Sequence, residues 1–383
     1  MINPENFLNS LLNSKINFFT GVPDSLLKNF CNLLENNKKI KHIIATNEGS
    51  AISLAIGSYL ATNKIGVVYM QNSGLGNAIN PLVSLADPMV YGIPMILVIG
   101  WRGETNKVKQ VKDEPQHKKQ GLITLRMLKN IGIPYKIIDK NSKNLDQIIK
   151  KIKKRSYKRS GPVALVVRKN SFLKLKERRL KIDKKLLNRE EVIALILDLI
   201  SKKTKIVSTT GMISRELYEQ RIQKKECHSN DFLCVGGMGH ASQIACGISL
   251  EKKKSKIICL DGDGSAIMHM GALAINPKHG NFKHIILNNK SHDSVGGQPT
   301  IAENLDLSKI GKICGYKNTL LINSKKNIKK ILKKEINKKM NSLIVINCNK
   351  GHRSNLGRPK ESILYRKKKI YEQSNLNKLR NET

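Results

Sequence analysis

The fold is decided by the segment Lys256-Ile-Ile-Cys-Leu-Asp-Gly-Asp-Gly-Ser-Ala266. Its apolar first half predicts a buried strand, and the glycine turn that follows predicts a tight passage into a helix. Gly262 and Gly264 let a ligand approach the backbone closely, and a helix starting near Ser265 offers free N–H groups to an anion. Asp263 adds a hard carboxylate oxygen of the kind that Mg²⁺ prefers. The segment therefore predicts a site for phosphate and a metal ion.

A second strand with a polar end follows. Ile285-Ile-Leu-Asn-Asn289 is an apolar run that ends in two amides, and Asn289 lies 26 positions after Asp263. Each motif taken singly is a common strand-end turn. Because parallel strands end on the same edge of a sheet, the pairing at this spacing favours a site where Asp263 and Asn289 converge on one cation.

Short apolar runs alternate with helical patterns along most of the chain. The first half predicts strands at 42–46, 66–71, 95–100, 135–139 and 162–168 and helices at 25–35, 49–61, 75–86 and 123–130. The second half predicts strands at 205–210, 232–235, 257–260, 285–288 and 342–348 and helices at 190–200, 241–250, 266–275 and 326–337. Near-continuous apolar strands separated by helices indicate parallel sheets that are covered on both faces.

The two halves are separated by a basic stretch without a sustained apolar period. We place a linker at residues 173–189, between a domain at 1–172 and a domain at 190–365. The polar tail at 366–383 is expected to pack loosely or to fray. The fold class is therefore α/β, with two doubly wound parallel-sheet domains and no third domain between them.

The net charge of +40 comes from 69 Lys and Arg residues against 29 Asp and Glu residues. The basic residues are spread over the whole chain, and aromatic residues make up 4% of it, so platforms for stacking bases are few. We therefore expect a solvated lysine-rich surface and no nucleic-acid partner. A basic α/β protein that binds nucleic acid is the alternative of another class. The positive field would also attract a small acidic substrate.

The same sequence predicts a cytoplasmic protein with no membrane partner. No apolar run approaches the roughly 20 residues that span a bilayer. The N-terminus lacks the pattern of a signal peptide. Seven cysteines at irregular spacings, without a Cys-x-x-Cys pair, indicate buried thiols in a reducing compartment.

Gly-Asp-Gly followed two dozen residues later by Asn-Asn resembles the cofactor-binding motif of the thiamine-diphosphate enzymes. The resemblance implies a pyrimidine-binding domain followed by a domain that binds the diphosphate and Mg²⁺. It also implies that Asp263, the side chain of Asn289 and the carbonyl of Ser291 ligate Mg²⁺ beside diphosphate oxygens. Gly262, Gly264 and Ser265 would then contact the diphosphate.

A glycine turn before this motif fits the same resemblance. Met238 in Gly236-Gly-Met-Gly-His240 lies 25 positions before Asp263, where the family places a bulky apolar residue beneath the cofactor. Gly237, Gly239 and His240 would line the cofactor with it. Met238 as an ordinary core residue is the alternative, since methionine fills irregular gaps well.

The first domain offers a carboxylate for the other end of the cofactor. Glu48 in Ala45-Thr-Asn-Glu-Gly-Ser-Ala51 follows a predicted strand, and alone it is an ordinary first-turn glutamate. The resemblance implies that Glu48 is the catalytic glutamate that hydrogen-bonds to the aminopyrimidine. Asn72 and Ser73, in a loop with Gly-x-Gly but no third dinucleotide-type glycine, would line the pyrimidine pocket; turn and helix-cap roles are equally consistent.

Several longer segments look like the phosphonopyruvate decarboxylases. They are Gly21-Val-Pro-Asp-Ser25, Gly100-Trp-Arg-Gly-Glu104, Lys112-Asp-Glu-Pro-Gln-His-Lys-Lys-Gln-Gly121 and His292-Asp-Ser-Val-Gly-Gly-Gln-Pro-Thr300. The resemblance implies decarboxylation of 3-phosphonopyruvate, a 2-oxo acid, to phosphonoacetaldehyde in phosphonate biosynthesis. Sulfopyruvate decarboxylase is the nearest alternative. An acetolactate-synthase-like enzyme fits less well, because such chains carry a third domain between these two.

The substrate would need a proton donor and donors for its phosphonate. His117 is the candidate proton donor or orienting residue, since histidine titrates near neutrality, although a surface histidine is the alternative. Arg102, Arg353 and Arg358, with Lys112 behind them, are candidates for the phosphonate because arginine presents a fork of donors. In so basic a chain, most such residues are expected to be solvated.

The resemblance also implies an assembly. In this family the two halves of one site come from different subunits, so Glu48 would face Asp263 across the interface of a homodimer or higher homo-oligomer.

Overall fold

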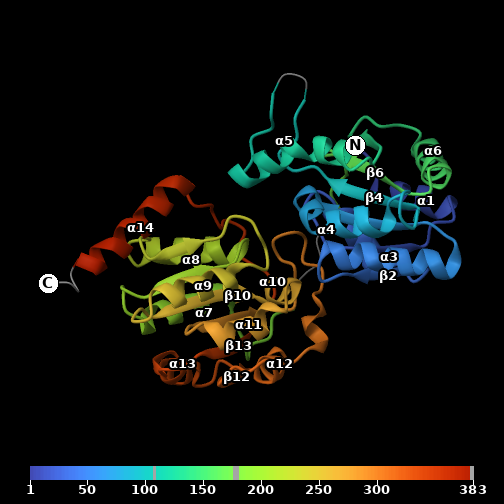
Figure 1. The fold of residues 1–383 in the computed structure, drawn as a ribbon. Coiled ribbons are helices and arrows are strands. Elements are labelled where there is room, and N and C mark those ends of the chain that lie inside the picture. The colour runs from blue at the N-terminus through green and yellow to red at the C-terminus, as the bar shows by residue number, and fades with distance from the viewer. Residues whose placement is uncertain (107–108, 176–180, 380–383) are drawn as a thin grey trace. The chain divides into compact units, whose positions relative to one another are not determined.

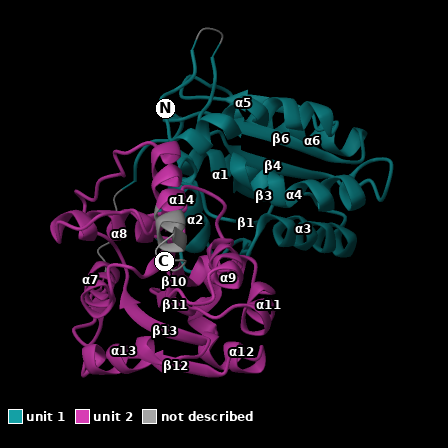
Figure 2. Cartoon of the chain, turned by 60° about the vertical axis from the view of Figure 1, so that its left-hand side comes forward, with its two compact units in different colours: residues 1–178, 294–299 teal, residues 179–293, 300–383 magenta. Residues whose placement is uncertain are grey.

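The computed structural model describes residues 1–106, 109–175 and 181–379, and within 373–379 it describes the backbone alone. The chain divides into two compact units (Figure 2). Unit 1 comprises residues 1–178 together with 294–299, and unit 2 comprises residues 179–293 together with 300–383.

Unit 1 is built on a six-stranded sheet in which every pairing is parallel (Figure 1). The strand order is β2-β1-β3-β4-β6-β5. The strands are β1 (Phe18–Gly21), β2 (Lys41–Ile44), β3 (Gly66–Gln71), β4 (Met95–Gly100), β5 (Tyr135–Ile138) and β6 (Pro162–Val167). The central strands are buried almost throughout, which explains why their sequences are continuous apolar runs.

Helices cover both faces of this sheet. They are α1 (Pro4–Asn13), α2 (Lys28–Glu35), α3 (Glu48–Thr62), α4 (Leu75–Pro81), α5 (Pro115–Asn130) and α6 (Leu145–Lys158), with short turns η1 (Asn72–Gly74) and η2 (Leu82–Ala86) beside α4. Helices α1, α2 and α6 contribute to one apolar cluster, and α3, α4 and α5 to another. Val67 of β3 belongs to the first cluster and Val68 to the second, as the alternation of side chains along a strand requires.

Unit 2 repeats the architecture with a seven-stranded parallel sheet. Its order is β12-β13-β11-β10-β8-β9, and β7 pairs with β13. The strands are β7 (Leu187–Asn188), β8 (Lys205–Ser208), β9 (Asp231–Leu233), β10 (Ile257–Gly262), β11 (Lys283–Asn288), β12 (Asn318–Ile322) and β13 (Ser342–Asn349).

The helices of unit 2 also lie on both faces of its sheet. They are α7 (Arg189–Leu199), α8 (Met212–Gln223), α9 (Ala241–Glu251), α10 (Asp263–Met268), α11 (Ala272–His279), η3 (Ile301–Asn304), α12 (Leu307–Ile313), α13 (Ile328–Asn337) and α14 (Ile363–Leu379). Helices α7, α8 and α13 share one apolar cluster, whereas α9 to α12 contribute to two others. The predicted fold class, two doubly wound parallel-sheet domains, is confirmed.

Two sequence expectations are wrong. The helix expected at 266–275 is two helices, because the backbone leaves the helical region at His269 (φ −128°, ψ 56°) and restarts after Gly271. The tail expected to fray from residue 366 instead continues as helix α14 to Leu379. Arg366 is buried on it, and Lys368 and Lys369 pair with Glu372 one turn away.

Among the described residues, no helix combines the length and the apolar character needed to cross a membrane.

Candidate active site

The edge of the unit 2 sheet brings Asp263 and Asn289 together. Strands β10 and β11 are parallel neighbours in which Gly262 pairs with Leu287, so the residues just beyond both strands meet. The Asp263 carboxyl is buried, and it accepts hydrogen bonds from the Thr300 hydroxyl and from the backbone N–H of Asn289. The convergence follows from strand order, since parallel neighbours end at one edge.

The turn after β11 adds further oxygen atoms beside Asp263. The Asn289 side chain accepts from the N–H of Ser291 (3.2 Å) and donates to Asp293 Oδ2 (2.5 Å). The Ser291 hydroxyl donates to Asp293 Oδ1 (2.8 Å). Carboxylate, amide and carbonyl oxygens are the ligands that Mg²⁺ takes in proteins, so the donor chemistry of this turn fits that ion.

Burial raises the pKa of Asp263 to about 6, although the hydrogen bond from Thr300 and those from backbone N–H groups oppose the rise. A bound cation would favour the ionised carboxylate and so lower the pKa that burial raises. Asp263 is therefore well suited to be a metal ligand.

A buried arginine holds this turn in place. Arg189 donates to Asp293 Oδ2 (2.5 Å) and, through two nitrogens, to Glu216 (2.8 and 3.1 Å). Burial lowers the pKa of Arg189, but the two carboxylates outweigh it and raise the pKa. Sequence reasoning missed this group, because Arg189 stood at the end of a basic linker and its partners are 27 and 104 positions away.

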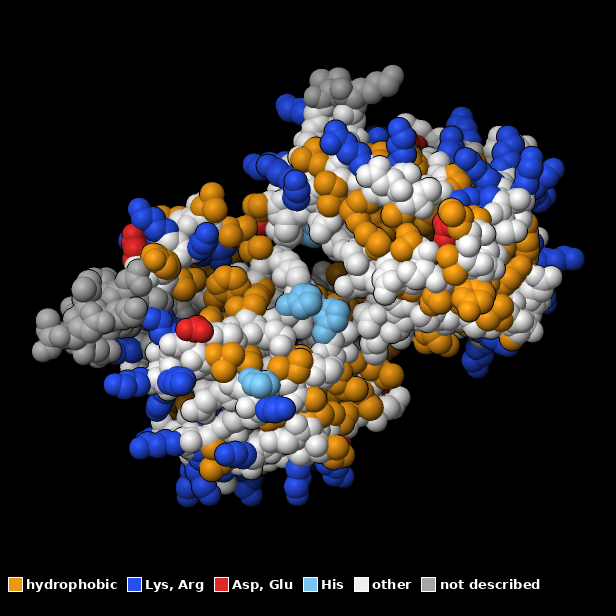
Figure 3. Space-filling view, viewed as in Figure 1, with side chains coloured by type: hydrophobic (Ala, Val, Ile, Leu, Met, Phe, Trp, Pro, Cys, Tyr) orange, Lys and Arg blue, Asp and Glu red, His pale blue; other side chains and the backbone are white. Residues whose placement is uncertain are grey.

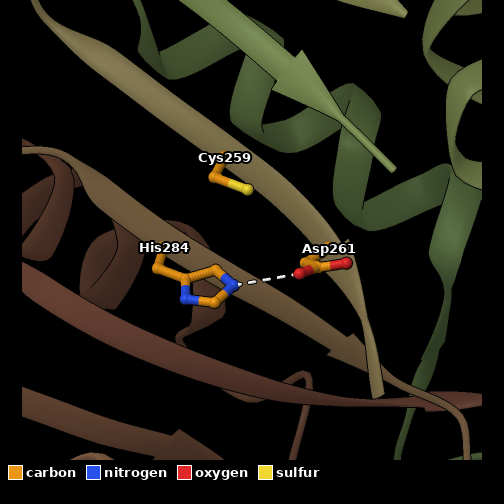
Figure 4. Close-up of side chains that lie close together, drawn as sticks. All are labelled: Cys259, Asp261 and His284. Carbon is orange, nitrogen blue, oxygen red and sulfur yellow. Dashed lines mark hydrogen bonds and ion pairs between the residues drawn. The ribbon is translucent and has the colours of Figure 1, made fainter. Parts of the chain in front are cut away.

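A second buried network lies directly behind the glycine turn (Figure 4). Asp261 Oδ2 lies 3.2 Å from His284 Nε2, and Asp261 Oδ1 accepts from the N–H of Gly262 (2.9 Å). The other ring nitrogen of His284 lies 3.1 Å from the Tyr316 hydroxyl, and Cys259 completes the cluster. Both nitrogens of His284 are thus engaged in positioning the start of the turn. Side-chain alternation along β10 and the register of Cys259 with His284 bring these residues together.

The predicted glycine turn at residues 236–240 lies against the Gly262–Ser265 turn. Gly237 (φ +64°) and Gly239 (φ +89°) adopt left-handed conformations that favour glycine. The N–H of Gly239 donates to Ser265 Oγ (3.1 Å), whose other hydroxyl contact is Thr209 Oγ1 at 2.8 Å. Met238 is half-buried in this turn.

Glu48 begins helix α3 in unit 1, and its side chain is buried. Asn77 Nδ2 donates to Glu48 Oε2 over 2.8 Å. A Cβ added to Gly74 would stand 2.3 Å from Glu48 Oε1, so the turn after β3 approaches the carboxyl as only glycine allows. Burial raises the pKa of Glu48, and the hydrogen bond from Asn77 partly opposes it.

Asn72 and Ser73 lie in η1, on the same turn as Gly74. Asn72 is buried, and its amide bonds to Thr124 Oγ1 (2.9 Å) and to both the carbonyl and the N–H of Arg102 (3.0 and 3.1 Å). These contacts tie the ends of β3 and β4 together. Ser73 is exposed and donates to Gln71 Oε1 (2.9 Å). Their roles in lining a pyrimidine pocket stay predictions.

Two of the four basic candidates for the phosphonate already hold carboxylates. Arg102 donates two hydrogen bonds to the Asp113 carboxylate (2.7 and 2.6 Å). Burial raises the pKa of Asp113, but the hydrogen bonds and charge of Arg102 outweigh burial and hold this pKa at about 2. Arg353 binds Glu190 and Glu219. The other two candidates, Lys112 and Arg358, are exposed.

His117 lies in the first turn of α5 and is half-buried. The loop before it packs tightly, since a Cβ on Gly103 (φ +64°) would lie 2.0 Å from the His117 carbonyl oxygen. This packing fixes the backbone of His117, while its proposed role in proton transfer stays a prediction.

Two family models match the chain. The N-terminal TPP binding domain of the thiamine pyrophosphate enzymes matches residues 5–122, and the C-terminal TPP binding domain of the same enzymes matches residues 209–346. Thiamine pyrophosphate is thiamine diphosphate under its other name. The two matches fall in the two units, and they contain Glu48 and the Asp263–Ser291 region respectively.

Named relatives agree with these matches. Phosphonopyruvate decarboxylase from Streptomyces hygroscopicus is 29% identical over 94% of this chain and 91% of its own length. Sulfopyruvate decarboxylase subunit alpha from Methanococcus maripaludis is 35% identical over 41% of this chain and 89% of its own length. Subunit beta from Methanocaldococcus jannaschii is 33% identical over 41% of this chain and 81% of its own length. The chain therefore belongs to the thiamine-diphosphate-dependent decarboxylases, the family of the phosphonopyruvate and sulfopyruvate decarboxylases.

Proposed function

We propose that this enzyme decarboxylates 3-phosphonopyruvate to phosphonoacetaldehyde and CO₂ with thiamine diphosphate and Mg²⁺, as a step in phosphonate biosynthesis. The observation that carries the proposal is the similarity to phosphonopyruvate decarboxylases over 94% of the chain, which includes both cofactor-binding domains. The seven cysteines are free thiols, which supports the reducing cytoplasm as its location.

The cofactor, when bound, supplies the electron sink that accepts the electron pair released as CO₂ departs. Glu48 holds its aminopyrimidine through the buried carboxyl described above, and Asp263, Asn289 and the carbonyl of Ser291 hold Mg²⁺. Burial raises the pKa of Glu48, and a raised pKa suits this task because it favours a shared proton between the carboxyl and a ring nitrogen. His117 is proposed to orient the substrate or to donate a proton.

The remaining contacts to the cofactor come from the two glycine turns of unit 2. We propose that Gly262, Gly264 and Ser265 contact the diphosphate. Gly237, Met238, Gly239 and His240 would line the cofactor. The hydrogen bond between Gly239 and Ser265, which joins the two turns, supports this arrangement.

We also propose a homodimer or a higher homo-oligomer, with Glu48 of one subunit facing Asp263 of another. The surface of unit 1 supports this proposal. Residues 42–100 carry three charged side chains, whereas 26% of the whole chain is charged. Exposed apolar residues in this stretch include Leu54, Leu60 and Met89. Charge depletion with exposed apolar side chains is typical of the core of an interface.

Sulfopyruvate decarboxylase is the second candidate function. Its alpha and beta subunits each match about two fifths of this chain, at 33–37% identity. Those matches are higher in identity but shorter than the match to phosphonopyruvate decarboxylase, which covers 94% of this chain at 29% identity. A sulfopyruvate decarboxylase from Methanosarcina acetivorans is 27% identical over 86% of this chain, so a match over most of the chain does not separate the two substrates. The choice between the two substrates therefore needs a direct comparison.

The experiment compares phosphonopyruvate, sulfopyruvate and pyruvate, each with and without thiamine diphosphate and Mg²⁺. Phosphonopyruvate should give the highest kcat/KM, and turnover should require both the cofactor and the ion. Glu48→Gln should bind the cofactor in calorimetry but lose about 100-fold or more in kcat, the usual contribution of a positioned acid or base. Glu5→Gln, at an exposed position in unit 1, is the matched control. Full activity of Glu48→Gln would contradict the assignment.

A further inference from the structure

A phosphonate dianion needs hydrogen-bond donors, and the forks of Arg102 and Arg353 are occupied by carboxylates. Two histidines of unit 2 offer another set. His240 ends the glycine turn and is exposed, and His269 directly follows α10. Their rings stack with centroids 4.6 Å apart and planes at 21°. Histidine side chains are visible on the surface of unit 2 in Figure 3.

The two histidines lie beside the Gly262–Ser265 turn. The N–H of Gly239 binds Ser265 Oγ, and a Cβ on Gly239 would lie 2.5 Å from His269 Cδ2. The turn that carries His240 is therefore pressed directly against the ring of His269. Helix α10 runs from Asp263 to Met268, so His269 follows the proposed metal ligand by about 9 Å along the helix axis.

The two rings have different surroundings. His269 Nε2 is buried and has no hydrogen-bond partner among the described residues, whereas His240 is exposed to an incoming ligand. Burial lowers the pKa of His269, and the neighbouring His240 lowers it further, so His269 favours its neutral form. A neutral stacked ring can fix the orientation of His240 without repelling a charge on it.

We propose that His240 binds the phosphonate group of the substrate and that His269 is a positioning residue that orients His240 by stacking. This inference rests on the proposed function and adds the residue that selects the substrate. A phosphonate loses its second proton near neutrality, so it can both donate that proton to a ring nitrogen and accept a charge-assisted hydrogen bond from a ring N–H. A sulfonate has no second proton to share. His240 therefore favours phosphonate over sulfonate.

The test uses the full chain loaded with thiamine diphosphate and Mg²⁺. His240→Gln, saturated with cofactor, should raise KM for phosphonopyruvate about tenfold or more, as expected for loss of a charge-assisted hydrogen bond, and by a larger factor than KM for pyruvate. Calorimetry on enzyme saturated with cofactor should show about tenfold weaker binding of phosphonoacetate, an unreactive phosphonate. His279→Gln, an exposed histidine in the same unit, should behave as wild type.

Variants of His269 show whether this residue orients His240 or only stabilises the fold. His269→Phe keeps a ring for stacking and should retain a KM close to wild type. His269→Ala removes the ring and should raise KM for phosphonopyruvate without changing kcat for pyruvate. Equal loss on both substrates would instead mark a general structural role and overturn the assignment of His269.

The outcomes distinguish this inference from the proposed function. If wild type turns over phosphonopyruvate and His240→Gln matches it, the inference is overturned while the function stands. If wild type does not turn over phosphonopyruvate, the proposed function fails. Phosphonoacetate binding then still decides the inference, since equal affinity in wild type and His240→Gln would overturn it.

Discussion

Gly74 sets how closely the turn after β3 approaches the carboxyl of Glu48. A Cβ at Gly74 would stand 2.3 Å from Glu48 Oε1, which forces one of the two to move. Gly74→Ala should therefore lower kcat about 100-fold, the loss typical of a 1 Å displacement of a reacting group. Gly76→Ala is the matched control, because a Cβ there meets nothing within 4 Å. Steady-state kinetics check both, and full turnover by Gly74→Ala would show that Glu48 is not held as described.

Asp263 should make the stability of the metal-free protein depend on pH. Burial raises its pKa to about 6 in the folded chain from the ordinary aspartate value of 3.8, so the folded state holds this proton more tightly. Its contribution to the free energy of unfolding is therefore fully present below pH 4 and is lost as pH rises through 6. Urea unfolding in a chelator, compared between wild type and Asp263→Asn from pH 4 to 7, measures that contribution.

The comparison with Asp263→Asn removes the effect of other titrating groups, such as Asp231, whose pKa burial also raises to about 6. At pH 7, Mg²⁺ should stabilise wild type but not Asp263→Asn, because the ion binds only the folded carboxylate site. A difference between the two proteins that stays constant with pH would contradict the buried, protonated Asp263.

At the scale of elements, the packing of α5 under the end of β4 depends on Gly103. This residue combines φ +64° with a Cβ position 2.0 Å from the carbonyl oxygen of His117. Gly132 has a similar φ of +69° but open space around it. Gly132→Ala should cost about 1–2 kcal/mol for the left-handed backbone alone. Gly103→Ala should cost about 3 kcal/mol or more, because overpacking adds to that strain.

Denaturant unfolding checks this pair of glycine variants. The difference between the two free energies of unfolding separates the contact from the backbone strain, since both glycines have a positive φ of similar size. Equal destabilisation would show that α5 shifts at no cost and that the contact does not determine its position.

At the scale of the whole molecule, the charge-poor stretch at 42–100 predicts the assembly state. Lysine and arginine side chains are scattered over the visible surface (Figure 3), whereas residues 42–100 carry only three charged side chains. Sedimentation equilibrium should give a multiple of the 43.0 kDa chain mass. Leu54→Glu, on the exposed side of α3, should dissociate the assembly and abolish turnover, because a buried unpaired charge is costly.

Leu364→Glu on α14 is the control for this variant, since Leu364 is also exposed but lies outside the charge-poor stretch. It should leave mass and activity unchanged. A wild-type monomer that is fully active at micromolar concentration would contradict a site shared between subunits.

Local sequence patterns predicted the strands well where nearly every residue of the strand is buried. The bounds of β3 and β4 match the expected ranges, because both are unbroken apolar runs between helices. Helix α6 was missed, since its lysines obscure the buried stripe formed by Ile149 and Ile152. Helix α1 was missed as well, although Asn3 caps it and Pro4 begins it, both of which are recognisable start signals.

The Gly262–Ser265 turn and the strand-end Asn289 were determined by the sequence itself, because glycine turns after apolar strands are local features. The tertiary structure alone decided which charged and polar groups surround them. Arg189 reaches Asp293, His284 reaches Asp261 and His240 stacks on His269 only because sheet order brings distant segments to one edge. Likewise, the occupancy of Arg102 and Arg353 by carboxylates depends on partners that no local pattern identifies. Short-range periodicity encodes burial, whereas pairing of buried polar groups depends on long-range contacts.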